Sequence, residues 1–131
     1  MKKELEVVAA LIKKGDKFLL CQRKAQDHYG LLWEFPGGAA EKDESFSSAI
    51  EREIKEELGL EVRAGRVIEK FFDEDENLKI KVFLFACRIV SGTPQKKDCH
   101  DFGFFAFSEI EELNLAPADK KIYAYLKDAA K

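Results

Sequence analysis

The segment from Gly38 to Leu60 constrains this chain more than any other part of the sequence. Within residues 45–58 apolar residues recur at three- and four-residue steps, which predicts a helix, and a glycine follows where a helix commonly ends. The same helix gathers four acidic residues towards its C-terminal end, and these are Glu51, Glu53, Glu56 and Glu57. Like charges three or four residues apart cost stability, and negative charge near a helix C-terminus opposes the helix dipole.

Two interpretations of this acidic cluster are open from the residues alone. Charge clusters of this kind are typical of a solvated helix face. They are also typical of a metal site, because hard divalent cations prefer oxygen ligands and remove the repulsion between carboxylates. Gly37 and Gly38, immediately upstream, favour the metal site, since glycine lets the backbone approach a ligand closely and expose its carbonyls.

The stretch GAAEKDESFSSAIEREIKEELGL resembles the Nudix box, G-x5-E-x7-R-E-U-x-E-E-x-G-U, in which U is an aliphatic residue. Every fixed position of the pattern is present, namely Gly38, Glu44, Arg52, Glu53, Ile54, Glu56, Glu57, Gly59 and Leu60. This resemblance implies the Nudix fold and a loop-helix-loop that binds Mg²⁺ or Mn²⁺. It also implies an enzyme that hydrolyses a diphosphate bond in a nucleotide.

The resemblance assigns roles to individual residues of the box. It implies that the metals are held by four groups, which are the carboxylates of Glu53, Glu56 and Glu57 and the carbonyl of Gly37. Arg52 is expected to orient a glutamate, and Glu44 to brace the loop or to act through a water molecule. Such metals polarise phosphoryl oxygens and make a bound water more acidic.

Outside the box the chain resembles the MutT-type subgroup of nucleoside triphosphate pyrophosphohydrolases, which release a nucleoside monophosphate and pyrophosphate. The segment LLWEFPGG is similar to a loop whose aromatic residue, here Phe35, lines the base pocket. Arg23 resembles an arginine that contacts the substrate. In LAPADKKI, Asp119 corresponds to a side chain that meets the base edge, although an N-cap of the last helix is an equally good interpretation of this residue.

One position departs from the subgroup pattern. A glutamate is usual about six residues before an aromatic residue in the strand that leads to the last helix, and Cys99 stands there if Phe105 is that aromatic. Asp98 or Asp101 could supply the carboxylate to the metal site instead. The identity of the general base is therefore open, and Glu53 is the alternative.

The order of elements predicts an α+β fold, a mixed sheet sandwiched between helices (α/β/α). Length fits one domain over residues 1–131. Strands are expected at residues 5–12, 18–23, 66–72, 80–90 and 102–107, an ordered loop at residues 25–38, and a second helix at residues 118–129.

Composition limits the partners. The net charge of −3 gives no reason to expect nucleic acid or a membrane surface. No run reaches the roughly 20 apolar residues that span a bilayer. Three widely spaced cysteines without a CxxC pair indicate free thiols in a reducing, cytoplasmic environment. We expect a monomer or homodimer whose partner is its nucleotide.

Within the enzyme class, the triphosphate substrate would be an oxidised or modified nucleotide such as 8-oxo-dGTP or a modified CTP or dCTP. ADP-ribose and dinucleoside polyphosphates are alternative substrates of Nudix hydrolases. A non-catalytic, nucleotide-binding Nudix-like domain is an alternative from another class. Such domains commonly lack carboxylates of the box, and the complete box in this chain favours an enzyme.

Overall fold

Strand β1 (Lys3–Lys14) organises the sheet of this computed structural model, which describes residues 2–131. Along one edge it pairs in parallel with β6 (Leu78–Ser91), and along the other it pairs antiparallel with β4 (Gly37–Ala39). Its C-terminal end continues as a hairpin into β2 (Lys17–Gln22). The central strand is thus bound on both sides by segments from distant parts of the chain.

The remaining strands extend this sheet at both edges. On one side β5 (Glu61–Glu74) pairs antiparallel with β6, and on the other β3 (Trp33–Glu34) and β7 (Asp101–Phe105) both pair with β2. The main path runs β3-β2-β1-β6-β5, with parallel and antiparallel neighbours. The predicted mixed sheet is confirmed.

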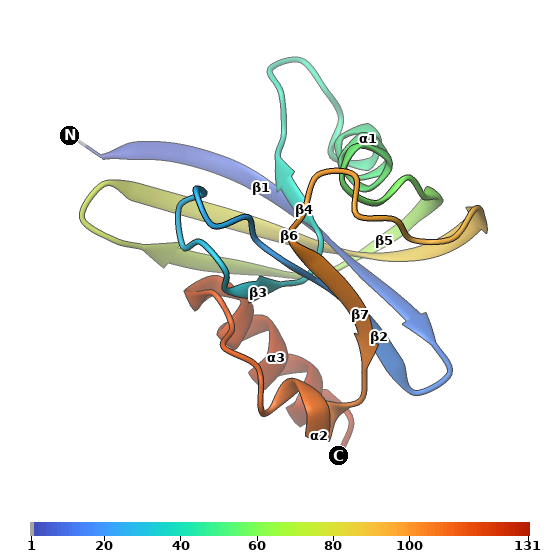
Figure 1. The fold of residues 1–131 in the computed structure, drawn as a ribbon. Helices are drawn as coiled ribbons and strands as arrows, with labels where there is room; N and C mark the ends of the chain where they lie inside the picture. The colour runs from blue at the N-terminus through green and yellow to red at the C-terminus, as the bar shows by residue number, and fades with distance from the viewer. Residues whose placement is uncertain (1) are drawn as a thin grey trace.

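Helices cover both faces of the sheet (Figure 1). Helix α1 (Phe46–Leu58) packs on one face, and α2 (Phe107–Ile110) and α3 (Pro117–Ala129) pack on the other. Side chains of β1 alternate between the two cores, as a strand requires. Those facing α1 are Val8, Ala10 and Ile12, and those facing α3 are Val7, Ala9 and Leu11. The expected α/β/α sandwich is therefore present.

Helix α1 has the boundaries that its sequence predicts. Ser45 is its N-cap, and the hydroxyl of this residue accepts a 3.1 Å hydrogen bond from the Ser48 N–H. At the other end Gly59 adopts φ 69°, and its N–H donates to the carbonyl of Lys55 at 3.0 Å. Both caps hold the glutamate-rich turns in a fixed place against the sheet.

Three expectations on local structure were wrong. The predicted loop at residues 25–38 contains β3 and the start of β4, which form only because they pair with β2 and β1. Strand β5 begins at Glu61 rather than residue 66, since its first residues pair with the end of β6. The predicted strand at residues 102–107 ends at Phe105, and Phe107 begins α2. In residues 2–131 no helix combines the length and the apolar character that crossing a membrane requires.

Candidate active site

Gly38 brings β4 directly against the acidic helix, and Gly37 brings it against β1. A Cβ atom added at Gly38 would lie 2.4 Å from Oε2 of Glu53, and one added at Gly37 would lie 1.9 Å from the carbonyl oxygen of Val8. No larger residue fits at either position without moving a neighbour. The close approach places the β4 backbone beside the α1 carboxylates, as a site that uses both would require.

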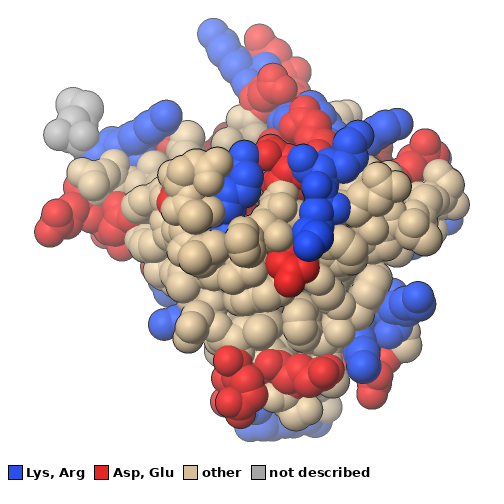
Figure 2. Space-filling view, viewed as in Figure 1, with Lys and Arg blue, Asp and Glu red and all other residues tan. Residues whose placement is uncertain are grey.

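A cleft of about 240 Å³ lies where β4, α1 and the segment before β7 meet. Five acidic side chains line it: Glu53 and Glu57 from α1, Glu34 from β3, and Asp27 and Asp98 from loops. Asp98 and Cys99 lie on the same cleft, whereas Asp101 does not. The space-filling view shows acidic and basic side chains next to one another on this face (Figure 2).

The carboxylate of Glu57 lies in an unfavourable electrostatic environment within the cleft. Its Oε1 atom is buried and has no hydrogen-bond partner among the described residues. Burial raises the pKa of Glu57 well above its ordinary value, and the nearby charges of Glu34 and Glu53 raise it further. An orphaned buried carboxylate oxygen among like charges fits a divalent cation, which would supply the missing partner.

Arg52 holds the other box glutamates in place. Its guanidinium donates to Glu44 at 2.7 Å, to Glu53 at 3.0 Å and to Glu56 at 3.2 Å. The hydrogen bonds from Arg52 lower the pKa of Glu44 to about 2, and the same contact raises the pKa of Arg52 above its ordinary value. Arg52 therefore contacts three glutamates of the box at once, and its role in orienting one of them stays a prediction.

Glu56 stands apart from the cleft. Its side chain is 56% exposed, it pairs with Arg52, and it does not line the cleft. In the part of the chain that the structure describes, no three His, Cys, Asp or Glu side chains converge as a ready metal-binding group. The box thus presents two carboxylates to the cleft, while Glu56 lies outside it and pairs with Arg52.

Asp98 lines the cleft and is paired with Lys24 from the loop that follows β2. Its Oδ1 accepts a 2.6 Å hydrogen bond from the ammonium of Lys24. Its neighbour Cys99 shares a hydrogen bond with the buried Cys21, and this contact lowers the pKa of Cys99. The position at which the subgroup pattern has a glutamate therefore presents a thiol, with a lysine-paired aspartate beside it.

Glu34 is a site residue that the sequence interpretation missed. Its carboxylate lies 2.7 Å from the guanidinium of Arg23, and its side chain is 17% exposed. Burial raises the pKa of Glu34, and the charge of Arg23 opposes that rise without cancelling it. The signal was available in WEFPGG, because an acidic residue between a tryptophan and a phenylalanine has to find a buried partner.

A second pocket, of about 280 Å³, adjoins the cleft and shares Arg23, Glu34 and the three β4 residues with it. The three residues that the sequence assigned to substrate, Arg23, Phe35 and Asp119, all line this pocket. One continuous wall thus runs from the carboxylates to a more apolar chamber. The two compartments match a ligand with a charged end and a flat, uncharged end.

Asp119 sits at the floor of this pocket, 8% exposed, with Oδ1 accepting a 2.9 Å hydrogen bond from the backbone N–H of Phe35. Burial raises the pKa of Asp119 well above its ordinary value, and the charge of Glu34 adds to the rise. The N-cap interpretation is wrong, because α3 is capped at Ala116 and Asp119 belongs to its first turn. Phe35 itself is 2% exposed, so its ring belongs to the core.

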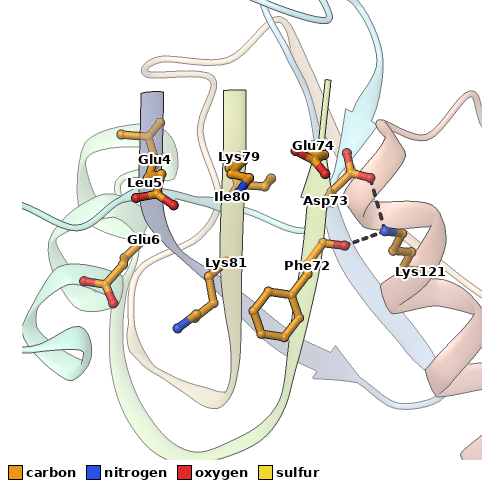
Figure 3. A pocket seen from close by; sticks show the side chains of 10 residues that line it. All are labelled: Glu4, Leu5, Glu6, Phe72, Asp73, Glu74, Lys79, Ile80, Lys81 and Lys121. Carbon is orange, nitrogen blue, oxygen red and sulfur yellow. Dashed lines mark hydrogen bonds and ion pairs between the residues drawn. The ribbon is translucent and has the colours of Figure 1, made fainter. Parts of the chain in front are cut away.

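A larger hollow of about 700 Å³ adjoins the pocket at the start of β1 and shares Leu5, Asp73 and Ile80 with it (Figure 3). Lys121 of α3 pairs with Asp73 at 3.2 Å and donates to the carbonyl of Phe72. This contact ties α3, which carries the buried aspartate, to the end of β5. The hollow contains none of the box residues.

Comparison with known proteins identifies the box and the fold together. The model of the NUDIX domain matches residues 2–126. The chain belongs to the Nudix family. Members of this family generally use divalent metal ions, which agrees with the carboxylate-lined cleft.

Several relatives of this Nudix hydrolase have names that state a substrate. The CTP pyrophosphohydrolase of Escherichia coli is 38% identical over 117 residues, which cover 89% of this chain and 87% of the relative. The 8-oxo-dGTP diphosphatase of Proteus vulgaris is 33% identical over 86 residues, which cover 63% and 77%.

Solved structures agree on the architecture. The solution structure of the Escherichia coli ORF135 protein is 36% identical, with a TM-score of 0.79 and coverage of 97% of this chain and 91% of that one. A MutT protein from Methanosarcina mazei is 22% identical, with a TM-score of 0.87 and coverage of 99% and 97%. At 22% identity, the likeness to the Methanosarcina mazei protein supports the Nudix fold alone, and the ORF135 protein has the same fold.

Proposed function

We propose that this Nudix hydrolase converts a nucleoside triphosphate to the monophosphate and pyrophosphate, acting on oxidised or modified nucleotides such as 8-oxo-dGTP or modified CTP and dCTP. The observation that carries the proposal is the shared wall formed by β4. It joins a cleft of carboxylates to a pocket with a buried aspartate. The names of the two sequence relatives support this substrate class.

The cleft is the place for the metal, which we take to be Mg²⁺ or Mn²⁺. Glu53, Glu57 and the carbonyl of Gly37 would hold it, and Glu56 would join them by exchanging its pairing with Arg52. When bound, a divalent cation offsets the charge that develops on the phosphoryl oxygens and makes a bound water more acidic. Asp98 becomes a further ligand only if Lys24 releases it.

The chain's own residues supply orientation and proton transfer. Glu53 serves as the general base, because it lines the cleft and its carboxylate is held in one orientation by Arg52. Arg23 lies in both compartments and would contact the phosphates next to the nucleoside. Its pairing with Glu34 fixes the guanidinium at that junction.

Asp119 would read the edge of the base. Burial favours its neutral form, and a neutral carboxyl both donates and accepts hydrogen bonds. A group fixed in this way in a largely apolar pocket can discriminate between bases that differ in one donor or acceptor. An oxidised guanine and a cytosine are the bases that the relatives' names suggest for this contact.

A substrate screen tests the proposal. Normal and oxidised triphosphates, including 8-oxo-dGTP, CTP, dCTP and 5-methyl-dCTP, are incubated with Mg²⁺ or Mn²⁺ and inorganic pyrophosphatase, and phosphate is measured. We expect turnover that is lost in Glu57→Gln and Glu53→Gln but kept in Glu112→Gln, a surface change of the same type. ADP-ribose hydrolysis releases AMP and ribose 5-phosphate but no pyrophosphate, so its turnover is followed by chromatography of AMP, and faster turnover of ADP-ribose would exclude the triphosphate class. Nucleotide binding without any turnover would favour a non-catalytic domain.

A further inference from the structure

The loop between β2 and β3 forms an outer wall of the nucleoside pocket. His28 and Tyr29 of this loop both line the pocket. Their rings are in contact, with centroids 4.0 Å apart and planes inclined by 44°. Because aromatic side chains stack on bases and sugars, these two rings are placed to enclose a nucleoside.

The backbone of this wall is held in a conformation that it would not adopt alone. Tyr29 has φ 56° and Leu31 has φ 64°, both in the left-handed region that non-glycine residues rarely enter. Such positions persist only where surrounding contacts hold them, and they are common in segments that clamp a ligand. The contacts that hold the loop therefore decide whether the wall stays closed.

Two such contacts tie the loop down from opposite sides. On the inner side the Arg23 guanidinium donates to the carbonyl of His28 at 2.6 Å. On the outer side Asp75, from the turn between β5 and β6, binds both rings through one atom. Its Oδ2 accepts the Tyr29 hydroxyl at 2.7 Å and lies 2.9 Å from Nε2 of His28.

The two oxygens of Asp75 have separate tasks. Oδ1 accepts the backbone N–H groups of Asn77 at 2.9 Å and Leu78 at 2.8 Å, which shapes the turn. Oδ2 serves only the loop among the hydrogen bonds of the described residues. The Tyr29 hydroxyl and the other donors hold the pKa of Asp75 well below its ordinary value, so the carboxylate remains ionised. Hydrogen bonds to an ionised acceptor are the stronger kind.

We propose that Asp75 is a latch that positions His28 and Tyr29 as the closed outer wall of the nucleoside pocket, and so sets affinity for the nucleoside. The inference rests on the proposed function and adds a residue to it. None of the three residues lines the carboxylate cleft. The latch therefore acts on binding of the nucleoside end and leaves the hydrolytic groups in place.

The separation of tasks within Asp75 gives a sharp test. In Asp75→Asn the amide oxygen still accepts from the turn, while the amide nitrogen that replaces Oδ2 cannot accept the Tyr29 hydroxyl. Tyr29→Phe removes the same bond from the other side and keeps the ring. Glu76→Gln is the matched control, since Glu76 is an exposed neighbour in the same turn and loses the same charge.

Steady-state kinetics on the best triphosphate is the first measurement. We expect Asp75→Asn and Tyr29→Phe to raise KM about tenfold, as loss of one charge-assisted hydrogen bond implies, with kcat within about twofold of wild type. The double variant should be little worse than Asp75→Asn alone, because Asp75→Asn already removes the hydrogen bond from the Tyr29 hydroxyl. Equal KM values in Asp75→Asn and Glu76→Gln would overturn the latch, as would a fall in kcat that accounts for the whole effect.

Hydrogen exchange without nucleotide separates this inference from the proposed function. Amides of residues 26–32 should exchange at least about tenfold faster in Asp75→Asn and Tyr29→Phe than in wild type or Glu76→Gln. Unchanged exchange refutes the latch whatever the enzyme hydrolyses. If wild type hydrolyses no triphosphate, the proposed function fails, and calorimetry with CMP and 8-oxo-dGMP replaces kinetics. Equal binding by wild type and Asp75→Asn would then refute the latch.

Discussion

The carboxylate of Asp119 accepts the backbone N–H of Phe35 at 2.9 Å and thereby joins α3 to the segment that leads into β4. The two residues are 84 positions apart in the sequence. The bond lies at the floor of the nucleoside pocket, so one contact both closes the fold and presents a polar group to a ligand.

Removing this hydrogen bond should lower the free energy of unfolding, whereas replacing the Asp119 carboxyl by an amide should not. In Asp119→Ala the buried N–H of Phe35 loses its acceptor, and we expect the free energy of unfolding to fall by roughly 1–3 kcal/mol. Asp119→Asn keeps an acceptor and stays neutral at every pH. Urea unfolding followed by circular dichroism measures both variants. An alanine variant as stable as wild type would contradict the assigned role.

The same pair predicts how stability depends on pH. The pKa of Asp119 is raised in the folded state, so the folded protein binds this proton more tightly than the unfolded chain does. The resulting stabilisation of the fold is complete at pH values below the ordinary pKa of 3.8. It is lost as the pH rises through the raised folded pKa. Asp119→Asn should therefore gain stability relative to wild type as the pH increases from about 4 towards neutrality. Unfolding curves at several pH values measure the trend, and a stability difference between the two proteins that does not change with pH would show that the pKa is not raised.

The Glu57 carboxylate should destabilise the folded protein when no metal is bound. With metal bound, it should be required for activity. Its orphaned, buried oxygen and raised pKa predict that Glu57→Gln is more stable than wild type in EDTA at neutral pH. Adding Mg²⁺ or Mn²⁺ should raise the melting temperature of wild type only, since binding stabilises by mass action. We expect activity to fall by roughly 100-fold or more, because a metal ligand supplies several kcal/mol. Calorimetric melting with and without metal tests all but the last point, which needs the pyrophosphate assay.

Arg52 should not tolerate replacement by lysine. It binds Glu44, Glu53 and Glu56 at once through a planar fork, and a single ammonium cannot reproduce those directions. We expect Arg52→Lys to lose activity by roughly 10–100-fold, as is usual when a group that orients a metal ligand changes. Lys55→Arg, the reverse exchange between the same two residue types on the same helix, serves as the control. Equal turnover in the two variants would mean that Arg52 does not orient the glutamates.

Helix α1 could be predicted from sequence because its information is local. Periodic apolar residues, the Ser45 cap and the Gly59 end all lie within one short segment. Strands β3 and β4 could not be predicted, since they exist through pairing with residues far along the chain. For the same reason the contact between Tyr29 and Asp75 could not be predicted, since the two residues are 46 positions apart in the sequence.

The site was predictable to the extent that it depends on box positions. The resemblance to the Nudix box pointed to Glu53 and Glu57, which the structure places on one cleft. The resemblance also put Glu56 with them, but its side chain is exposed, pairs with Arg52 and does not line the cleft, a rotamer choice that no spacing encodes. Glu34 was missed because its role depends on burial and on Arg23, which are tertiary properties.

The pairing of Lys24 with Asp98 predicts competition between a lysine and a metal ion for one carboxylate. If Asp98 is a ligand, Lys24→Met should tighten Mn²⁺ binding several-fold, because the ammonium at 2.6 Å no longer has to be displaced. Lys96→Met removes the same charge nearby, from a lysine that faces Asp101 at 3.9 Å, and corrects for the general electrostatic effect. Titration of Mn²⁺ by electron paramagnetic resonance measures each affinity. Equal tightening in both variants, together with unchanged binding in Asp98→Asn, would exclude Asp98 from the metal site and leave the glutamates of α1 to hold the ion.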